Sequence, residues 1–224
     1  MTGEYEAWRG ITFQPARETI LPDALLPYLR AHSHVLDVGC NKGAVALFLG
    51  QAGHRVHGID LNPDAIDIAV RRAREVDLSG ALQFEVADLL EMDGEAQFDA
   101  VTMIRFLTCL PDEADWRQAN SKARAMLADD GLLYIQDFLL TWGSDDYRRR
   151  YEEGAALGWR FGNFAVRKPD GALQFIAHHH SAEELAELRA DYRTEIFRPY
   201  SSISIHGNEV LMFELLLRKL PSST

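Results

Sequence analysis

At residues 35–43 the chain reads Val35-Leu36-Asp37-Val38-Gly39-Cys40-Asn41-Lys42-Gly43, and this stretch decides the fold. A pattern typical of a buried strand runs into a turn bounded by glycines, and an apolar helical segment begins at Ala44. A strand, a tight turn and a helix in that order place backbone N–H groups and a helix N-terminus at the carboxyl edge of a sheet. The stretch therefore predicts an α/β protein that holds a small polar ligand at this edge.

Strand-like and helix-like segments alternate around this turn, and turn residues separate them. The predicted strands are residues 35–38, 55–60, 82–87, 98–104 and 132–138, and the predicted helices are residues 44–53, 63–76 and 112–127. Asn62 precedes Pro63, which is the pattern of a capped helix start with proline at the first helical position. Such alternation implies right-handed βαβ crossovers and a mostly parallel sheet.

The pattern changes after Leu140. A charged helical segment is predicted at residues 145–153, and two strand-like runs, 159–166 and 172–178, surround a proline and glycine turn. Ser181 and Glu184 match a capping box, which predicts a helix over residues 182–190. Two long β-rich stretches, residues 193–205 and 209–220, are predicted to pair as an antiparallel hairpin that finishes the sheet.

The chain has 224 residues and a formal net charge of −11 at pH 7. Its length fits one domain with an inserted cap better than two independent domains. The expected parts are an N-terminal arm (1–34), a core (35–140), a cap (141–181) and a C-terminal helix with a hairpin (182–224). Because the overall negative charge opposes a phosphate backbone, nucleic acid is not an expected partner.

Cysteine content and apolar patterning indicate the compartment. The two cysteines, Cys40 and Cys109, offer neither a disulfide framework nor a metal-binding set. The N-terminus lacks the basic-then-apolar pattern of a signal peptide, and no apolar run is long enough to cross a bilayer. We expect a reduced, cytoplasmic protein that does not bind membranes, and the sequence carries no signal for its oligomeric state.

Acidic residues follow successive predicted strands. Asp60 ends the second strand, Asp88 follows the third, and residues 103–110 follow the fourth. Because the carboxyl ends of parallel strands meet at one edge of a sheet, these positions form one cleft with the turn at 37–43. Asp60 is placed to accept hydrogen bonds from vicinal ribose hydroxyls, and Asp88 from an exocyclic amine. A ribose and an amino-purine together indicate an adenosine ligand.

Other nucleotide sites are not favoured by the glycine spacing. Gly39 and Gly43 do not form the Gly-x-Gly-x-x-Gly fingerprint of nicotinamide enzymes. No Lys-Ser/Thr pair of a phosphate-binding loop follows the turn. A hydride-transfer enzyme is therefore a minor alternative.

Several motifs resemble those of one family. Residues 35–43 resemble motif I of the class I S-adenosylmethionine-dependent methyltransferases. Similarity to the later motifs of that family is found in Val56-His57-Gly58-Ile59-Asp60-Leu61-Asn62-Pro63, Val86-Ala87-Asp88-Leu89, Phe98-Asp99-Ala100-Val101-Thr102-Met103 and Gly131-Leu132-Leu133-Tyr134-Ile135. Motif order and spacing make the similarity specific over about residues 35–140. It implies a Rossmann-like, doubly wound α/β fold whose mostly parallel sheet has seven strands, with S-adenosyl-L-methionine as cofactor.

The resemblance also implies which residues bind the cofactor. They are Asp37, Gly39, Cys40, Asn41 and Gly43 around the methionine portion, Asp60 with Leu61 at the ribose, Asp88 with Leu89 at the adenine, and Arg105 with Phe106 behind the sulfonium. Many members of the family have glycine where this chain has Asn41. Because asparagine tolerates a left-handed φ, the turn is expected to form.

Catalytic candidates lie after the core motifs. The run His178-His179-His180 does not favour zinc, since neighbouring strand residues point to opposite faces, and we predict no metal. His178 and His179 are candidates for a base or positioning group and His180 for a substrate contact; solvated loop histidines are the alternative. Asp137 ends the fifth predicted strand and, with Arg105, completes the catalytic candidates by family analogy, a structural hydrogen bond being the alternative role of Asp137.

Aromatic residues outside the core suggest an acceptor pocket. Tyr5, Trp8, Trp142 and Tyr147 are predicted acceptor contacts, and ordinary packing is the alternative for each. The run Arg148-Arg149-Arg150 could clamp an anionic substrate. The acidic residues around it favour a solvated helix with internal ion pairs instead.

These observations predict methyl transfer to a small molecule by in-line displacement, with an oxygen or nitrogen acceptor preferred. Two alternatives stay open: methylation of a protein or RNA, and a non-catalytic subunit that binds the cofactor. The acidic charge disfavours the first alternative. Asp60 and Asp88 support cofactor binding but say nothing about turnover.

Overall fold

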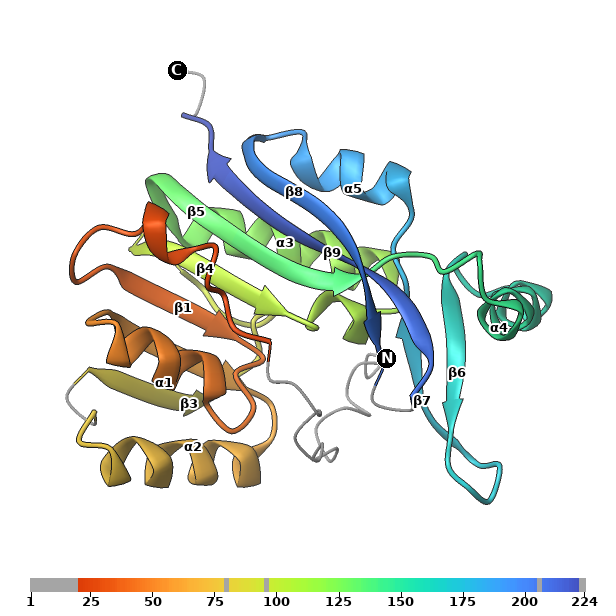
Figure 1. Cartoon of the computed structure of the whole chain (residues 1–224), viewed down its shortest axis with the longest axis horizontal. Coiled ribbons are helices and arrows are strands. Elements are labelled where there is room, and N and C mark those ends of the chain that lie inside the picture. Colours follow the sequence, from red (N-terminus) through yellow and green to blue (C-terminus); the bar gives the residue numbers. More distant parts are fainter. Residues whose placement is uncertain (1–19, 79–80, 95–96, 205–206, 222–224) are drawn as a thin grey trace.

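The computed structural model describes residues 20–78, 81–94, 97–204 and 207–221. Its centre is a seven-stranded sheet in the order β3-β2-β1-β4-β5-β9-β8 (Figure 1). Neighbouring strands from β3 to β5 pair in parallel, and β9 pairs antiparallel with both β5 and β8. The strands are β1 (His34–Val38), β2 (Arg55–Asp60), β3 (Leu82–Val86), β4 (Phe98–Ile104), β5 (Leu127–Phe138), β8 (Tyr192–Ile203) and β9 (Glu209–Lys219). The predicted fold is confirmed.

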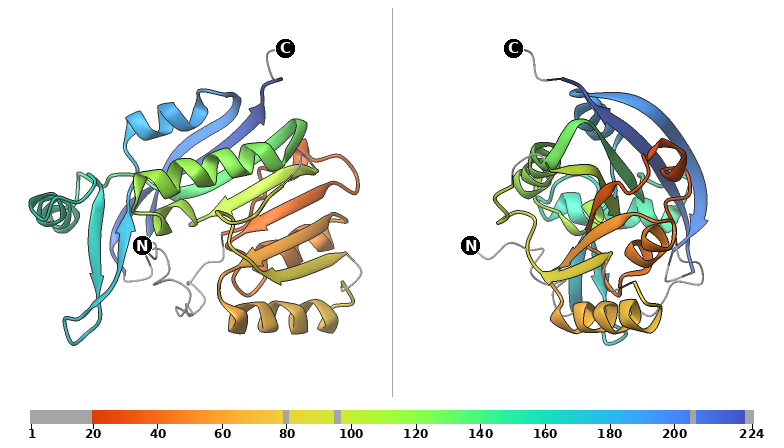
Figure 2. Two further views of the ribbon diagram at one scale, coloured as in Figure 1. Left: turned by 180° about the vertical axis from the view of Figure 1, so that it is seen from behind. Right: turned by 90° about the vertical axis from the view of Figure 1, so that its left-hand side faces the viewer.

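Helices cover both faces of this sheet (Figure 2). The described α-helices of the core are α1 (Ala44–Gln51), α2 (Pro63–Glu75), α3 (Glu113–Met126) and α5 (Ala182–Arg189), and the 3₁₀-helices are η2 (Leu26–Tyr28) and η3 (Leu107–Cys109). Leu36 of β1 packs in one apolar cluster with Trp116 of α3 and Leu185 of α5. Val35 packs in a second cluster with Leu47 of α1. Because successive strand residues point to opposite faces, β1 is covered on both sides.

The predicted helix starts have the expected side-chain caps. The Asn62 side chain accepts hydrogen bonds from the N–H groups of Asp64 at 3.0 Å and Ala65 at 3.3 Å. Ser181 and Glu184 form a reciprocal capping box at the start of α5. Each cap satisfies N–H groups that have no partner within the helix, and so fixes where the helix begins.

The start of β5 differs most from the predicted strands, and β6 (Asn163–Arg167) begins at Asn163 instead of residue 159. β5 begins at Leu127, because this buried residue pairs with Phe98 of β4 before the ladder resumes at Leu132 after an irregularity. The expected turn survives inside the strand as a residue with left-handed backbone, Asp130 at φ 62°. The turn residues before Leu132 therefore predicted the local backbone conformation correctly but placed the start of the strand five residues too late.

A cap lies beyond the carboxyl ends of the parallel strands (Figure 1). It consists of α4 (Asp145–Ala156) and the antiparallel pair β6 (Asn163–Arg167) and β7 (Leu173–His178), as the sequence predicted. Tyr147 of α4 and Phe164 of β6 share an apolar cluster with Met212 of β9, which fixes the cap on the sheet. Across the described ranges, no helix has the length and apolar character that a membrane span requires.

Candidate active site

The turn after β1 is built from residues with left-handed backbone. Gly39 has φ 68°, Asn41 has φ 49° and Gly43, which precedes α1, has φ 75°. Asn41 thus adopts the conformation that its side chain was expected to tolerate. The N–H of Cys40 donates to the carbonyl of Ile59 at 2.9 Å, which ties the turn to β2.

The carboxylate of Asp60 stands at the end of β2. It accepts hydrogen bonds from the N–H of Asn41 at 2.8 Å and from the N–H of Asn62 at 2.9 Å. Burial raises the pKa of Asp60, and these N–H groups act in the opposite direction. Asp88 follows β3, and its side chain accepts from the N–H of Leu90 at 2.9 Å. Both acids are thereby oriented by backbone donors.

Asp37 lies within β1 at the base of the turn. Its side chain is buried, and burial raises its pKa to about 7, with a smaller upward contribution from the charge of Asp60. Thr102 of β4 donates a hydrogen bond to Oδ1. Oδ2 is buried and has no hydrogen-bond partner within the described part of the chain. An unpartnered buried carboxylate oxygen indicates a site for a cationic or hydrogen-bond-donating group.

One cavity of about 630 Å³ runs from this turn to the cap, a volume within the usual range for small-molecule sites. All the predicted cofactor residues except Gly43 line it. The lining residues at or after the carboxyl ends of strands β1 to β4 include Asp37, Gly39, Cys40, Asn41, Asp60, Leu61, Asp88, Leu89, Arg105 and Phe106. Residues from α4, β6 and β7 line the other end. The structure therefore joins the predicted cofactor residues and the cap in one continuous space.

His179 is the member of the histidine run that lines the cavity. Its Nδ1 lies 2.7 Å from the hydroxyl of Tyr151, and its ring stacks on Phe138 with centroids 5.0 Å apart. Burial lowers the pKa of His179 well below the ordinary value, and the neighbouring histidines act in the same direction. A neutral imidazole held through Nδ1 leaves Nε2 as the ring nitrogen for a ligand.

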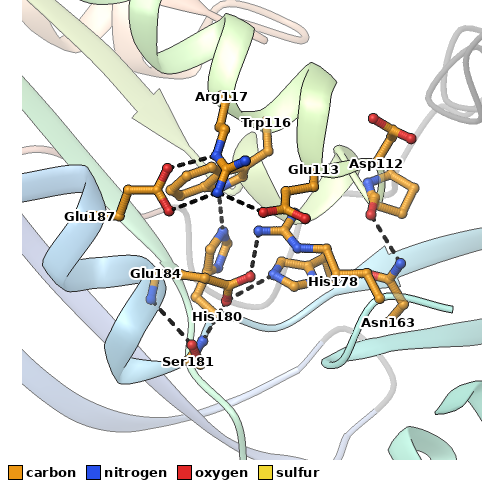
Figure 3. A network of polar contacts seen from close by, with 12 residues as sticks. Asp112, Glu113, Trp116, Arg117, Asn163, His178, His180, Ser181, Glu184 and Glu187 are labelled. Carbon is orange, nitrogen blue, oxygen red and sulfur yellow. Dashed lines mark hydrogen bonds and ion pairs between the residues drawn. The ribbon is translucent and has the colours of Figure 1, made fainter.

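His178 and His180 do not line the cavity; they join a buried polar network behind it (Figure 3). His178 hydrogen-bonds to the side chains of Asn163 at 2.8 Å and Glu184 at 3.2 Å. His180 accepts from the indole N–H of Trp116 at 3.1 Å. These contacts tie the end of β7 to α3 and α5. Over the described ranges, no three His, Cys, Asp or Glu residues are placed to hold a metal ion.

Asp137 is also placed behind the cavity wall. It is fully buried and accepts from the N–H groups of Phe138 at 2.8 Å and Thr108 at 3.1 Å. Burial raises its pKa to about 7, although these donors and the charge of Arg105 lower it. These contacts hold the backbone near Arg105 in place. They correspond to the structural hydrogen bond that the sequence analysis gave as the alternative role of Asp137.

The structure places one of the predicted aromatic acceptor contacts at the cavity and another outside it. Tyr147 lines the cavity, whereas Trp142 is 45% exposed and stacks on Phe161 outside it. Tyr5 and Trp8 lie outside the described residues. Of these four aromatic candidates, Tyr147 is therefore the one that the described part of the chain places at the cavity.

The run Arg148-Arg149-Arg150 forms internal ion pairs, as predicted, and Arg150 also faces the cavity. Arg148 pairs with Asp145, while Arg149 and Arg150 both pair with Asp146. Arg150 also lines the cavity, although the sequence interpretation favoured a solvated helix for the whole run. The signal that could have found it is its spacing, because Arg150 follows Tyr147 by three residues and so shares its face of the helix.

The cap hairpin supplies further lining residues that were not predicted: Phe164, Val166, Phe175 and Ala177. They alternate along two paired strands, and Phe164 stands opposite Ala177 while Val166 stands opposite Phe175. Period-two spacing was visible in the sequence, but only the docking of the hairpin shows which face meets the cavity.

Comparison with known proteins agrees with this geometry. Residues 35–131 match the family model of a methyltransferase domain. A SAM-dependent methyltransferase from Methanosarcina mazei has a similar structure, with a TM-score of 0.82, 29% identity, and coverage of 88% of this chain and 97% of that one. Residues 35–131 thus match a methyltransferase domain in sequence, and the fold is that of the class I methyltransferases.

Two curated relatives are each similar to part of this chain. A putative methyltransferase from Geobacillus is 34% identical over 44% of this chain and 40% of its own length. The 27-O-demethylrifamycin SV methyltransferase of Amycolatopsis mediterranei is 35% identical over 52% of this chain and 42% of its own length. The matches thus span less than half the length of these relatives.

The family's cofactor is S-adenosyl-L-methionine, and the residues of the methyltransferase cleft fit it. The buried, unpartnered Oδ2 of Asp37 suits the ammonium of a methionine portion. A Cβ atom at Gly39 would lie 3.0 Å from the Phe106 side chain. Any other residue at this position would therefore crowd Phe106 at the wall of the cavity. Asp60 and Asp88 present oriented acceptors along the same cavity.

Proposed function

We propose that this chain transfers a methyl group from S-adenosyl-L-methionine to a small-molecule acceptor, at an oxygen or a nitrogen atom. The observation that carries the proposal is the single cavity that joins the acidic strand ends to the apolar cap. The relative from Amycolatopsis is named as a 27-O-demethylrifamycin SV methyltransferase, which supports a small-molecule oxygen acceptor.

The residues at the strand ends would hold the cofactor. Asp60 would accept hydrogen bonds from the ribose hydroxyls, and Asp88 with Leu89 would bind the adenine. Asp37 and the turn that begins at Gly39 would surround the methionine portion. When bound, S-adenosylmethionine supplies a methyl group on a sulfonium that already carries its leaving group. Positioning of the acceptor is therefore the main task of the protein.

The cap residues would hold the acceptor and exclude water. Phe138, Tyr147 and Phe164 give this end of the cavity aromatic walls. His179 lines the same space as a neutral imidazole, so it would orient the acceptor through a hydrogen bond or accept its proton and become an imidazolium. Water exclusion by these side chains would protect the methyl donor and strengthen polar contacts inside the site.

Calorimetry with S-adenosylmethionine tests the cofactor assignment. We expect the wild-type protein to bind and Asp60→Ala to lose affinity at least tenfold, because the ribose hydroxyls lose their acceptor. Asp67→Asn is the matched control, since Asp67 is exposed on the neighbouring α2 helix. Absence of binding by the wild type, or equal binding by Asp60→Ala, would overturn the assignment.

Release of S-adenosylhomocysteine from a panel of acceptors tests the substrate class. We expect release with small molecules that carry hydroxyl or amine groups. Release supported by protein or RNA alone would contradict the small-molecule proposal. Cofactor binding without release by any acceptor would favour a non-catalytic subunit.

A further inference from the structure

Charged residues are distributed unevenly along the cavity. The end near the strands carries both signs, and its charged lining residues are Asp37, Lys42, Asp60, Arg72 and Asp88. From β4 onward the charged lining residues of the described chain are Arg105 and Arg150, with no carboxylate among them. The charged side chains that line the acceptor end are therefore both cationic, although the protein as a whole carries a net charge of −11.

Arg105 is held in this space by an unusual backbone. Its φ of 54° lies in the left-handed region, where residues other than glycine are uncommon, and its N–H donates to the carbonyl of Gln136 at 2.7 Å. Such conformations persist where the surrounding structure enforces them, and they gather at functional sites. The guanidinium carbon lies 5.8 Å from the centre of the Phe138 ring, on the acceptor side.

The guanidinium of Arg105 is incompletely satisfied. Its Nε is buried and has no hydrogen-bond partner within the described part of the chain. Tyr200 and Asp137 act on the Arg105 guanidinium through their charge, and within the described part of the chain no hydrogen bond joins it to Asp137, whose oxygens accept from the N–H groups of Phe138 and Thr108. A buried N–H group without a hydrogen-bond acceptor is costly, and an anionic ligand group that accepts from Nε would remove that cost.

Arg150 adds a second cation on the opposite element. Its guanidinium carbon lies 5.4 Å from the Tyr147 ring centre and 6.0 Å from that of Phe164, both of which line the cavity. An ion pair with Asp146 at 2.8 Å anchors it and partly balances its charge. Arg105 is accordingly the stronger candidate for direct binding of an anion, and Arg150 adds positive charge to the same end of the cavity.

The remaining walls at this end are apolar or neutral. Phe138, Phe164 and Phe175 surround the space, and His179 contributes an uncharged imidazole. Aromatic walls favour a flat apolar body, and a single unsatisfied guanidinium favours an oxygen anion, which it binds in a planar, bidentate manner.

We propose that the acceptor is an aromatic or other apolar molecule that carries an ionised oxygen acid, such as a carboxylate, and that Arg105 binds this group. This inference rests on the proposed methyl transfer and names its substrate class. Arg105 then determines specificity, because a neutral analogue of the same shape leaves the guanidinium unsatisfied.

The test is a calorimetric titration in two steps. S-adenosylhomocysteine is added first to saturation, and 2-naphthoate or 2-naphthamide is then titrated as the probe. We expect the carboxylate to bind at least tenfold more tightly than the amide to the wild type. Arg105→Gln removes this preference, and Arg105→Lys keeps part of it because the charge stays. Arg148→Gln is the control, since Arg148 belongs to the same arginine run as Arg150 but does not line the cavity.

Each outcome has a separate meaning. Absence of S-adenosylhomocysteine binding overturns the proposed function, and the inference falls with it. Binding of S-adenosylhomocysteine with equal affinity for the two probes, or with no binding of either, overturns the inference alone. A tenfold loss of S-adenosylhomocysteine affinity in Arg105→Gln, with the naphthoate preference intact, would show that Arg105 binds the cofactor's carboxylate instead. Thermal denaturation of each variant confirms that it is folded.

Discussion

The hydroxyl of Thr102 donates a hydrogen bond to Oδ1 of Asp37 at 2.8 Å, across the pairing of β4 with β1. The bond satisfies one carboxylate oxygen and leaves the other buried without a partner in the described part of the chain. Burial outweighs the Thr102 hydrogen bond and raises the pKa of Asp37 to about 7. In the ligand-free protein, the Asp37 carboxyl is therefore about half ionised near pH 7.

Stability without ligand is expected to fall as the pH rises toward and through 7. The pKa of Asp37 is higher in the folded than in the unfolded protein. Its contribution to the free energy of unfolding is therefore complete below about pH 4, and it is lost progressively as the pH rises to about 7, where Asp37 ionises in the folded protein. Asp137 contributes in the same direction, because burial raises its pKa to about 7 as well. The loss between pH 6 and 8 is on the order of 1 kcal/mol per group, or about 2–4 °C in melting temperature.

Melting curves of three proteins separate the two groups. Asp37→Asn and Asp137→Asn should each show a weaker fall between pH 6 and 8 than the wild type. S-adenosylhomocysteine should stabilise the wild type more at pH 8 than at pH 6, because its ammonium favours ionised Asp37. A pH slope in Asp37→Asn that equals the wild-type slope would contradict the assignment.

Replacement of His179 by glutamine is expected to slow turnover while cofactor affinity changes little. The ring lines the acceptor end, whereas the proposed cofactor residues stand at the strand ends. A loss of about 10²-fold in kcat would fit a proton-transfer or orienting role. Because the pKa of His179 is far below neutrality, the wild-type rate should show no titration of this group between pH 6 and 9. Equal kcat in the two proteins would exclude the role, and calorimetry reports cofactor binding separately.

Local signals in the sequence predicted the core of the site, whereas contacts between distant segments placed its acceptor end. The left-handed turn at Gly39 and Asn41 and the acid at Asp60 follow from strand, turn and helix patterns within a short window. The N–H of His179 donates to the carbonyl of Gly162 at 3.0 Å and that of His180 to the carbonyl of Phe138 at 2.9 Å, while the His178 side chain turns toward α5. Such long-range pairing decides which histidine meets the cavity, and periodicity alone cannot indicate it.

Glu184→Gln is expected to destabilise the attachment of the cap. Burial raises the pKa of Glu184, but the hydrogen bond from His178, the N–H of Ser181 and the charge of Arg160 lower it to about 2. The contribution of ionised Glu184 to the stability of the folded protein is complete above about pH 4.5 and is lost as the pH falls toward 2. Substitution should cost about 2 kcal/mol at pH 7. Glu183→Gln, at the exposed neighbouring position, should be close to neutral in denaturant unfolding. Equal effects of the two substitutions would show that the network in Figure 3 adds no stability.

Gly43→Ala is expected to destabilise the protein and to weaken cofactor binding, although Gly43 does not line the cavity. Its φ of 75° costs an alanine about 1–2 kcal/mol, and a Cβ atom there would lie 3.0 Å from both Ala69 and Phe84. Gly53→Ala is the matched control: Gly53 has φ 91°, but within the described part of the chain a Cβ atom at this position would meet no neighbour within 4 Å, so the variant isolates backbone strain from crowding. The excess loss of Gly43→Ala over Gly53→Ala in chemical denaturation measures how closely α2 and β3 pack against the turn. If crowding shifts the turn, affinity for S-adenosylhomocysteine falls in Gly43→Ala alone; equal affinity in both variants would show that the turn absorbs the extra methyl group without moving.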